Sequence, residues 1–108
     1  MKTQINSTLP QLKSFVFDSL VKAASKYDSK DDFMDNFNIE YNDIDYIFTA
    51  KLINDFYNTK YSEYKSLFDR DRYPLNSIAD ERERKTALLD YVLNEFAWIN
   101  FDDIWQAR

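Results

Sequence analysis

The chain has no glycine among its 108 residues, and this absence constrains the fold more than any other feature. The tight turns of β-hairpins and many β-bulges favour glycine, so a sheet-rich fold without any would be unusual. Helices can end on asparagine instead, which occurs nine times here. The two prolines, Pro10 and Pro74, stand where helices tend to begin or end. The sequence therefore predicts an all-α protein, with residues 1–108 forming a single domain.

Helical spacing of the apolar residues divides the chain into about five to six helices. A first helix is expected over about 9–26, a short second one over about 30–37, and a last long one over about 77–98. Asn100 resembles a further cap, leading into a terminal turn. The segment around Pro74 is the clearest loop, but it is too short and too central to divide two domains.

The stretch after Asn42 carries the prediction of the core. Asn42 can cap a helix, and Asp43 and Asp45 would then lie in its first turn, where the helix dipole favours negative charge. Two apolar stripes follow at helical spacing: Ile44, Phe48, Leu52 and Phe56 on one side, and Tyr46, Ala50, Ile53 and Tyr57 on the other. A helix that is apolar on two sides is usually buried. A compact bundle around a buried central helix at about 43–58 is therefore predicted, with a helical pattern continuing to about residue 69.

The short helix at about 30–37 has an acidic side. Ser29 and Asp32 form an S-x-x-D capping signature at its start. At 100° per residue, its apolar side chains fall on one side, namely Phe33, Met34 and Phe37. The opposite side carries Asp31, Asp32 and Asp35, together with Asp28 if that residue continues the helical phase. Four carboxylates without a cation among them are locally costly, so this side is expected to be a functional surface, with a merely solvated face as the alternative.

Acidity is concentrated in the middle and at the end of the chain. Residues 1–26 carry a net charge of +3, residues 27–56 carry −6, residues 57–85 carry +1 and residues 86–108 carry −3, which gives −5 overall. An acidic domain repels phosphate, so direct nucleic-acid binding is not expected. A partner with a basic surface would instead gain speed and specificity of association from the opposite charge.

Few kinds of catalysis are open to this composition. Without histidine and cysteine there is no imidazole or thiol nucleophile–base arrangement, and without glycine there is no glycine-rich phosphate loop. The adjacent acids Asp43 with Asp45 and Asp102 with Asp103 could in principle form acid–base pairs, but such pairs are usually solvated or act as caps. The EF-hand pattern is also missing. We therefore expect neither an enzyme, nor a bound metal, nor a cofactor.

Partner-binding residues are predicted from charge and from aromatic side chains. Tyr91 and Trp98 lie off the apolar face of the last long helix and could anchor a partner, although packing against the tail at residues 101–105 is the simpler alternative. The predicted partner-binding residues are Asp28, Asp31, Asp32, Asp35, Glu40, Asp43, Asp45, Asp55, Tyr91, Trp98, Asp102 and Asp103.

In size, acidity and inferred helicity the chain resembles two known groups of proteins. One is the phage or plasmid anti-defence proteins, including acidic DNA mimics that act on restriction or CRISPR enzymes; the other is the immunity proteins that neutralise nuclease toxins. The resemblance implies an inhibitor of a basic, nucleic-acid-acting enzyme. A non-inhibitory regulator or assembly module that self-associates is the competing class. No apolar run approaches the roughly 18 residues of a membrane span, so a cytoplasmic protein is expected. Its expected oligomeric state is a monomer or a homodimer.

Overall fold

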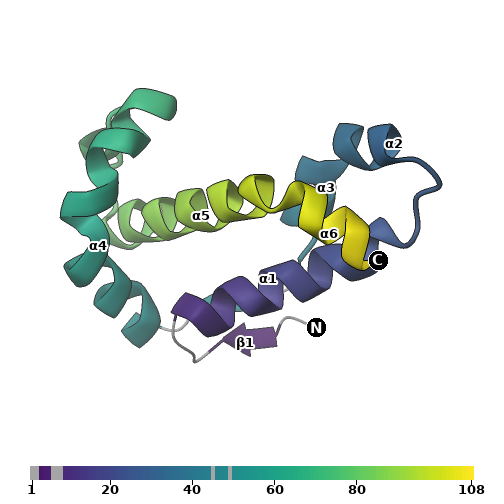
Figure 1. Ribbon diagram of the computed structural model, residues 1–108. Helices are drawn as coiled ribbons and strands as arrows, with labels where there is room; N and C mark the ends of the chain where they lie inside the picture. The colour runs from purple at the N-terminus through teal and green to yellow at the C-terminus, as the bar shows by residue number, and fades with distance from the viewer. Residues whose placement is uncertain (1–2, 6–8, 45, 49) are drawn as a thin grey trace.

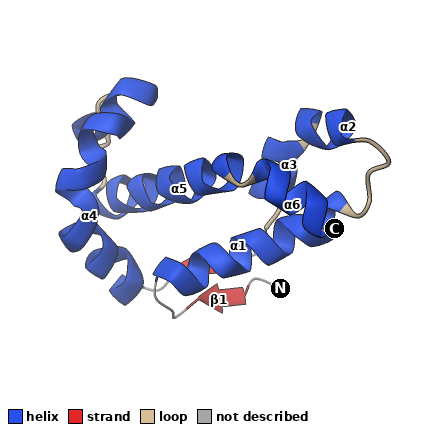
Figure 2. Cartoon of the chain, in the orientation of Figure 1, coloured by secondary structure: helices blue, strands red, loops and turns tan. Residues whose placement is uncertain are grey.

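The protein is a helical bundle with one small pair of strands (Figures 1 and 2). The computed structural model describes all residues except 1–2, 6–8, 45 and 49, and the side chains of 9–44 and 50–108. The helices are α1 (Leu9–Ala24), α2 (Lys30–Asp35), α3 (Phe37–Asn42), α4 (Ala50–Asp71), α5 (Glu81–Ile99) and α6 (Phe101–Ala107), with a 3₁₀ turn η1 at Leu75–Ser77. The strands are β1 (Thr3–Ile5) and β2 (Tyr46–Phe48). The predicted all-α bundle is confirmed as the dominant architecture.

Helix α5 is the centre of the bundle. It packs against α1, α4, α6 and η1, and it runs through the middle of the molecule in Figure 1. Its buried residues point in several directions around the helix, namely Leu88, Leu89, Tyr91, Val92, Leu93 and Ala97. The prediction that the segment at 43–58 forms the central helix is therefore wrong in its position. Leu52 and Phe56 of that segment do lie in the core, at 7% and 4% exposure.

The segment at 43–58 is divided between three elements rather than forming one helix. Asn42 ends α3 and Asp43 is the C-cap residue of that helix, so neither stands at a helix start. Residues Tyr46–Phe48 form β2, and α4 begins only at Ala50. Aromatic and β-branched residues favour strands, and a strand partner from the N-terminus decides the outcome here. Asp45 and the side chain of Phe48 lie outside what the structure describes.

The strand pair connects two distant parts of the chain. β1 and β2 are parallel, with Thr3 opposite Tyr46, Gln4 opposite Ile47 and Ile5 opposite Phe48. Parallel strands need a long connection, and α1, α2 and α3 provide it. This pairing draws the beginning of the chain against the segment that precedes α4.

Two single-residue junctions change the direction of the chain without glycine. Asn36 joins α2 to α3 at φ −107°, and Asn100 joins α5 to α6 at φ −99°. Each side-chain amide folds back and donates a 2.9 Å hydrogen bond to the preceding helix, from Asn36 to the Asp32 carbonyl and from Asn100 to the Phe96 carbonyl. The last α-helix therefore begins where the sequence predicts its terminal turn. The segment at 37–41, which alternates as a short strand would, is helical instead.

Candidate partner-binding surface

Helix α2 and the residue Asp28 just before its N-cap present four aspartates to solvent. Its N-terminus is capped as predicted, because the Ser29 hydroxyl accepts a 3.1 Å hydrogen bond from the Asp32 amide. We define the acidic face as the side chains of Asp28, Asp31, Asp32 and Asp35, all of which are exposed. Within the described part of the chain, none of these four carboxylates makes an ion pair.

Many other acids of the protein are neutralised by a neighbouring cation. Among the residues that the structure describes, seven of them have a lysine or arginine nitrogen within 2.6–3.4 Å. They are Glu40, Asp55, Glu63, Asp69, Asp71, Glu81 and Asp102. Among them, Asp55 lies on α4 and pairs with Lys51 one turn away at 2.6 Å. The acidic face thus differs from these positions in having no internal counter-charge.

A buried aromatic cluster holds α2 in place. Phe33 is completely buried, and its ring lies 5.3–5.8 Å between centroids from four other aromatic rings. They belong to Tyr27, Phe37, Phe101 and Trp105. Because Asp31, Asp32 and Asp35 stand on the same short helix as Phe33, this packing fixes the direction in which they point.

The tail helix brings two more predicted acids to the same end of the molecule. The Lys30 ammonium of α2 lies 2.6 Å from the Asp102 carboxylate, and Asp102 and Asp103 occupy the first turn of α6. Figure 1 shows α2, α3 and α6 together at one end. The sequence alone does not place Asp102 and Asp103 near Asp31 and Asp32, because only the folded chain brings α6 beside α2.

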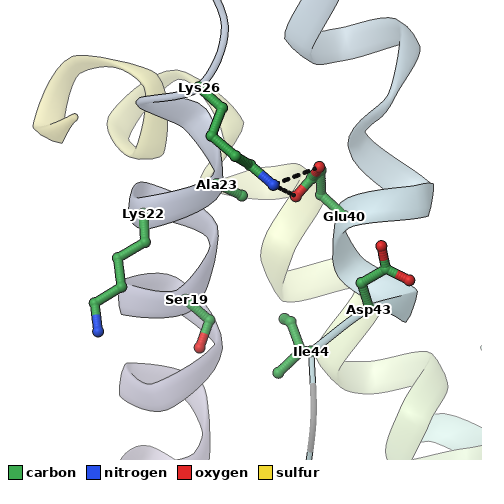
Figure 3. A pocket seen from close by; sticks show the side chains of 7 residues that line it. All are labelled: Ser19, Lys22, Ala23, Lys26, Glu40, Asp43 and Ile44. Atoms are coloured by element: carbon green, nitrogen blue, oxygen red, sulfur yellow. Dashed lines mark hydrogen bonds and ion pairs between the residues drawn. The ribbon is translucent and has the colours of Figure 1, made fainter.

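Glu40 has an internal role in the fold. Its carboxylate is 11% exposed and accepts two 3.0 Å hydrogen bonds from the Lys26 ammonium (Figure 3). The Tyr27 hydroxyl donates a third bond of 3.0 Å to the same carboxylate. The hydrogen bond with Glu40 raises the pKa of Lys26. Burial contributes most to the raised pKa of Tyr27, and the hydrogen bond to Glu40 raises it further. These contacts clasp α3 to the end of α1, so the Glu40 charge is compensated within the protein.

The charged side chains that line the pocket beside this clasp do not all point toward one centre. It is an open hollow of about 390 Å³ whose charged residues are Lys22, Lys26, Glu40 and Asp43. In Figure 3 the Lys22 ammonium points away from the Glu40 carboxylate. Asp43, at the end of α3, is exposed beside it. Among the described residues, no group of three acids is placed to hold a metal ion.

The two aromatic residues predicted as exposed anchors have different surroundings. Tyr91 is buried at 4% exposure, so the expectation that it is an exposed anchor is wrong. Its ring packs against Phe68 because α4 covers this side of α5, and its hydroxyl donates to Asp71. Trp98 is half-buried and stacks on Phe101, which confirms the simpler alternative of packing against the tail.

Burial of Tyr91 predicts an alkaline loss of stability. Desolvation and the hydrogen bond to Asp71 raise the pKa of Tyr91 to about 12, from an ordinary value of 10.0. The unfolded chain therefore loses this proton first, and the free energy of unfolding should fall as pH rises from about 10 to 12. Tyr91→Phe should remove this part of the fall in urea titrations at each pH. Tyr73→Phe is the control, since its ring is 48% exposed and it should keep the wild-type pH dependence.

Two exposed apolar side chains, one on α2 and one on the adjoining helix α3, were missed as site residues. Met34 is 44% exposed, although the helical projection placed it with the buried Phe33 and Phe37. Ile39 on α3 is 58% exposed. Phe33 is the one buried residue of α2, so the rest of the protein covers only a narrow side of this helix. Met34 is the next residue, turned 100° around the helix axis from Phe33, and it lies outside the covered side. Partly exposed apolar residues next to charged ones are typical of protein interfaces.

Across the described residues, no helix has the length and apolarity needed to cross a membrane. Comparison with known protein families, curated proteins and solved structures finds no match to this chain.

Proposed function

We propose that this protein binds and inhibits a nucleic-acid-acting enzyme by presenting its acidic face to a basic surface of that enzyme. The observation that carries the proposal is the absence of an internal cation from the four aspartates, within the described residues, while seven other acids are paired. Like charges on adjacent helical turns repel by a few tenths of a kcal/mol per pair. A basic partner would convert that repulsion into attraction.

The exposed apolar residues of α2 and α3 favour a protein as the partner. Met34 and Ile39 offer surface that a protein can desolvate. Asp31, Asp32 and Asp35 keep a defined direction, because they stand on the helix that is held by Phe33. A net charge of −5 is modest for a whole-surface imitation of DNA and suits one acidic patch. The same surface suits an anti-defence protein or an immunity protein, and the identity of the target separates the two.

The test begins with capture of the target from a host lysate and a measurement of its nucleic-acid-directed activity. Changing Asp28, Asp31, Asp32 and Asp35 together to Asn should slow association at least about tenfold at low salt, because steering by opposite charge accounts for 10–1,000-fold in such rates. The wild-type rate should itself fall as salt rises, since the Debye length shrinks from about 10 Å at 0.1 M to about 3 Å at 1 M. Inhibition should weaken in parallel.

A matched variant separates the acidic face from net charge. The changes Asp55→Asn, Glu63→Gln, Glu81→Gln and Glu83→Gln also remove four negative charges, but from α4 and from the start of α5. This variant should associate at close to the wild-type rate. If the two variants associate equally fast, or if the captured partner has no nucleic-acid-directed activity, the proposal is wrong.

A further inference from the structure

A groove lies between α4 and α5. It is lined by Tyr91, Val92 and Phe96 of α5 and by Tyr64 and Leu67 of α4. The volume is about 260 Å³, below the roughly 300–1,000 Å³ typical of small-molecule pockets. A groove of this size is suited to protruding side chains.

Ile99 stands at the end of this groove and is strongly exposed. Its exposed fraction is 79%, the largest among the exposed large apolar side chains of the described residues. It ends α5 directly before the junction at Asn100, so its position is set by two helices. Leu67 of α4, which also lines the groove, is 37% exposed. The surface thus carries both a protruding side chain and a depression that could receive one.

The charges around the groove are balanced, in contrast to the acidic face. Two cations, Lys13 and Arg70, and two anions, Asp71 and Glu95, lie among the lining residues. Lys13 reaches across from α1 and stands 5.4 Å from the centre of the Phe96 ring. Two copies of the acidic face would repel each other. A surface that carries both positive and negative charges can instead pack against its own copy, with cations opposite anions.

We propose that the α4–α5 groove is a twofold interface with a second copy of this chain. In this arrangement each Ile99 enters the groove of the partner subunit, and Glu95 of each copy faces Lys13 of the partner subunit. A twofold axis makes both contacts twice, so one protruding side chain and one charge pair contribute on each side. The balanced charge gives no attraction to the strongly basic partner expected for the acidic face.

The oligomeric state in solution tests this proposal. Sedimentation equilibrium of the purified chain should show a monomer–dimer equilibrium at concentrations up to about 1 mM, where even an interface with a Kd of about 1 mM is well populated. Ile99→Asp should shift the equilibrium to monomer by at least tenfold in Kd. Ile39→Asp is the matched control, because Ile39 is an exposed isoleucine of α3 that does not line the groove, and it should leave the equilibrium unchanged. Circular dichroism should show the same helix content for all three.

Exchange of charges tests the twofold geometry itself. Glu95→Lys and Lys13→Glu should each weaken the dimer, because each places like charges opposite one another twice. A mixture of the two variants should form a mixed dimer that recovers at least half of the wild-type association, since both contacts then join opposite charges. A monomeric wild-type chain, an Ile99→Asp variant that still dimerises, or a mixture no tighter than either variant would each overturn the proposal.

Discussion

Replacing Phe33 with alanine should lower the free energy of unfolding by about 3–5 kcal/mol, the usual cost of truncating a buried phenylalanine. The side chain is fully buried and is the one buried residue of α2. Its ring stacks on Phe101 and on Trp105 at centroid distances of 5.3 and 5.8 Å. The truncation therefore leaves a cavity and removes the main contact between α2 and α6. Urea titration followed by circular dichroism gives the measurement.

The neighbouring residue provides the control for this prediction. Met34→Ala removes a side chain of similar size from the same helix, but this side chain is 44% exposed. Its effect should stay near 0.5 kcal/mol, as is usual for surface positions. A loss below about 1 kcal/mol for Phe33→Ala would mean that α2 is not held by the aromatic cluster. The basis for a fixed acidic face would then be lost.

Leu93→Ala should cost about 2–5 kcal/mol, because its side chain is fully buried on α5 at the centre of the bundle. Helix α5 meets α1, α4 and α6, so a cavity there weakens several packing contacts together. A typical domain is stable by only about 5–15 kcal/mol, and the variant should unfold at much lower urea concentration. Thermal unfolding should show the same order of stability.

The control for Leu93 is another leucine in a less covered position. Leu67→Ala on α4 removes the same atoms from a side chain that is 37% exposed. In dilute solution, where the chain is expected to be monomeric, its cost should be within about 0.5 kcal/mol. Equal losses for the two leucines would contradict the assignment of α5 as the central helix.

Local signals in the sequence predict local structure well in this protein. The cap formed by Ser29, the start of α1 near Pro10 and the turn into α6 at Asn100 each depend on residues a few positions apart. The exposure of the four aspartates follows from the same short-range pattern. Such features are fixed by backbone hydrogen bonds and by side-chain direction on one helix, so a single sequence is sufficient to find them.

The errors have a common physical cause, which is a partner that is distant in the chain. The residues Tyr46–Phe48 fit a helical stripe, but pairing with Thr3–Ile5 makes them a strand. Tyr91 looks like a surface residue on an isolated helix until α4 covers it. The Lys26–Glu40 and Lys30–Asp102 pairs likewise join residues that only the fold brings together. Patterns along one helix carry no information about what covers it.

The asparagine junctions at Asn36 and Asn100 also affect the cost of ordering the chain. No residue of the described chain has a positive φ, so no position there needs the freedom that glycine provides. Glycine widens the set of conformations open to an unfolded chain, and replacing one at a compatible position typically stabilises a protein by about 0.4–1 kcal/mol. A chain that turns on asparagine with negative φ starts from a narrower unfolded ensemble. Folding therefore removes less backbone entropy than it would if the same turns were made with glycine.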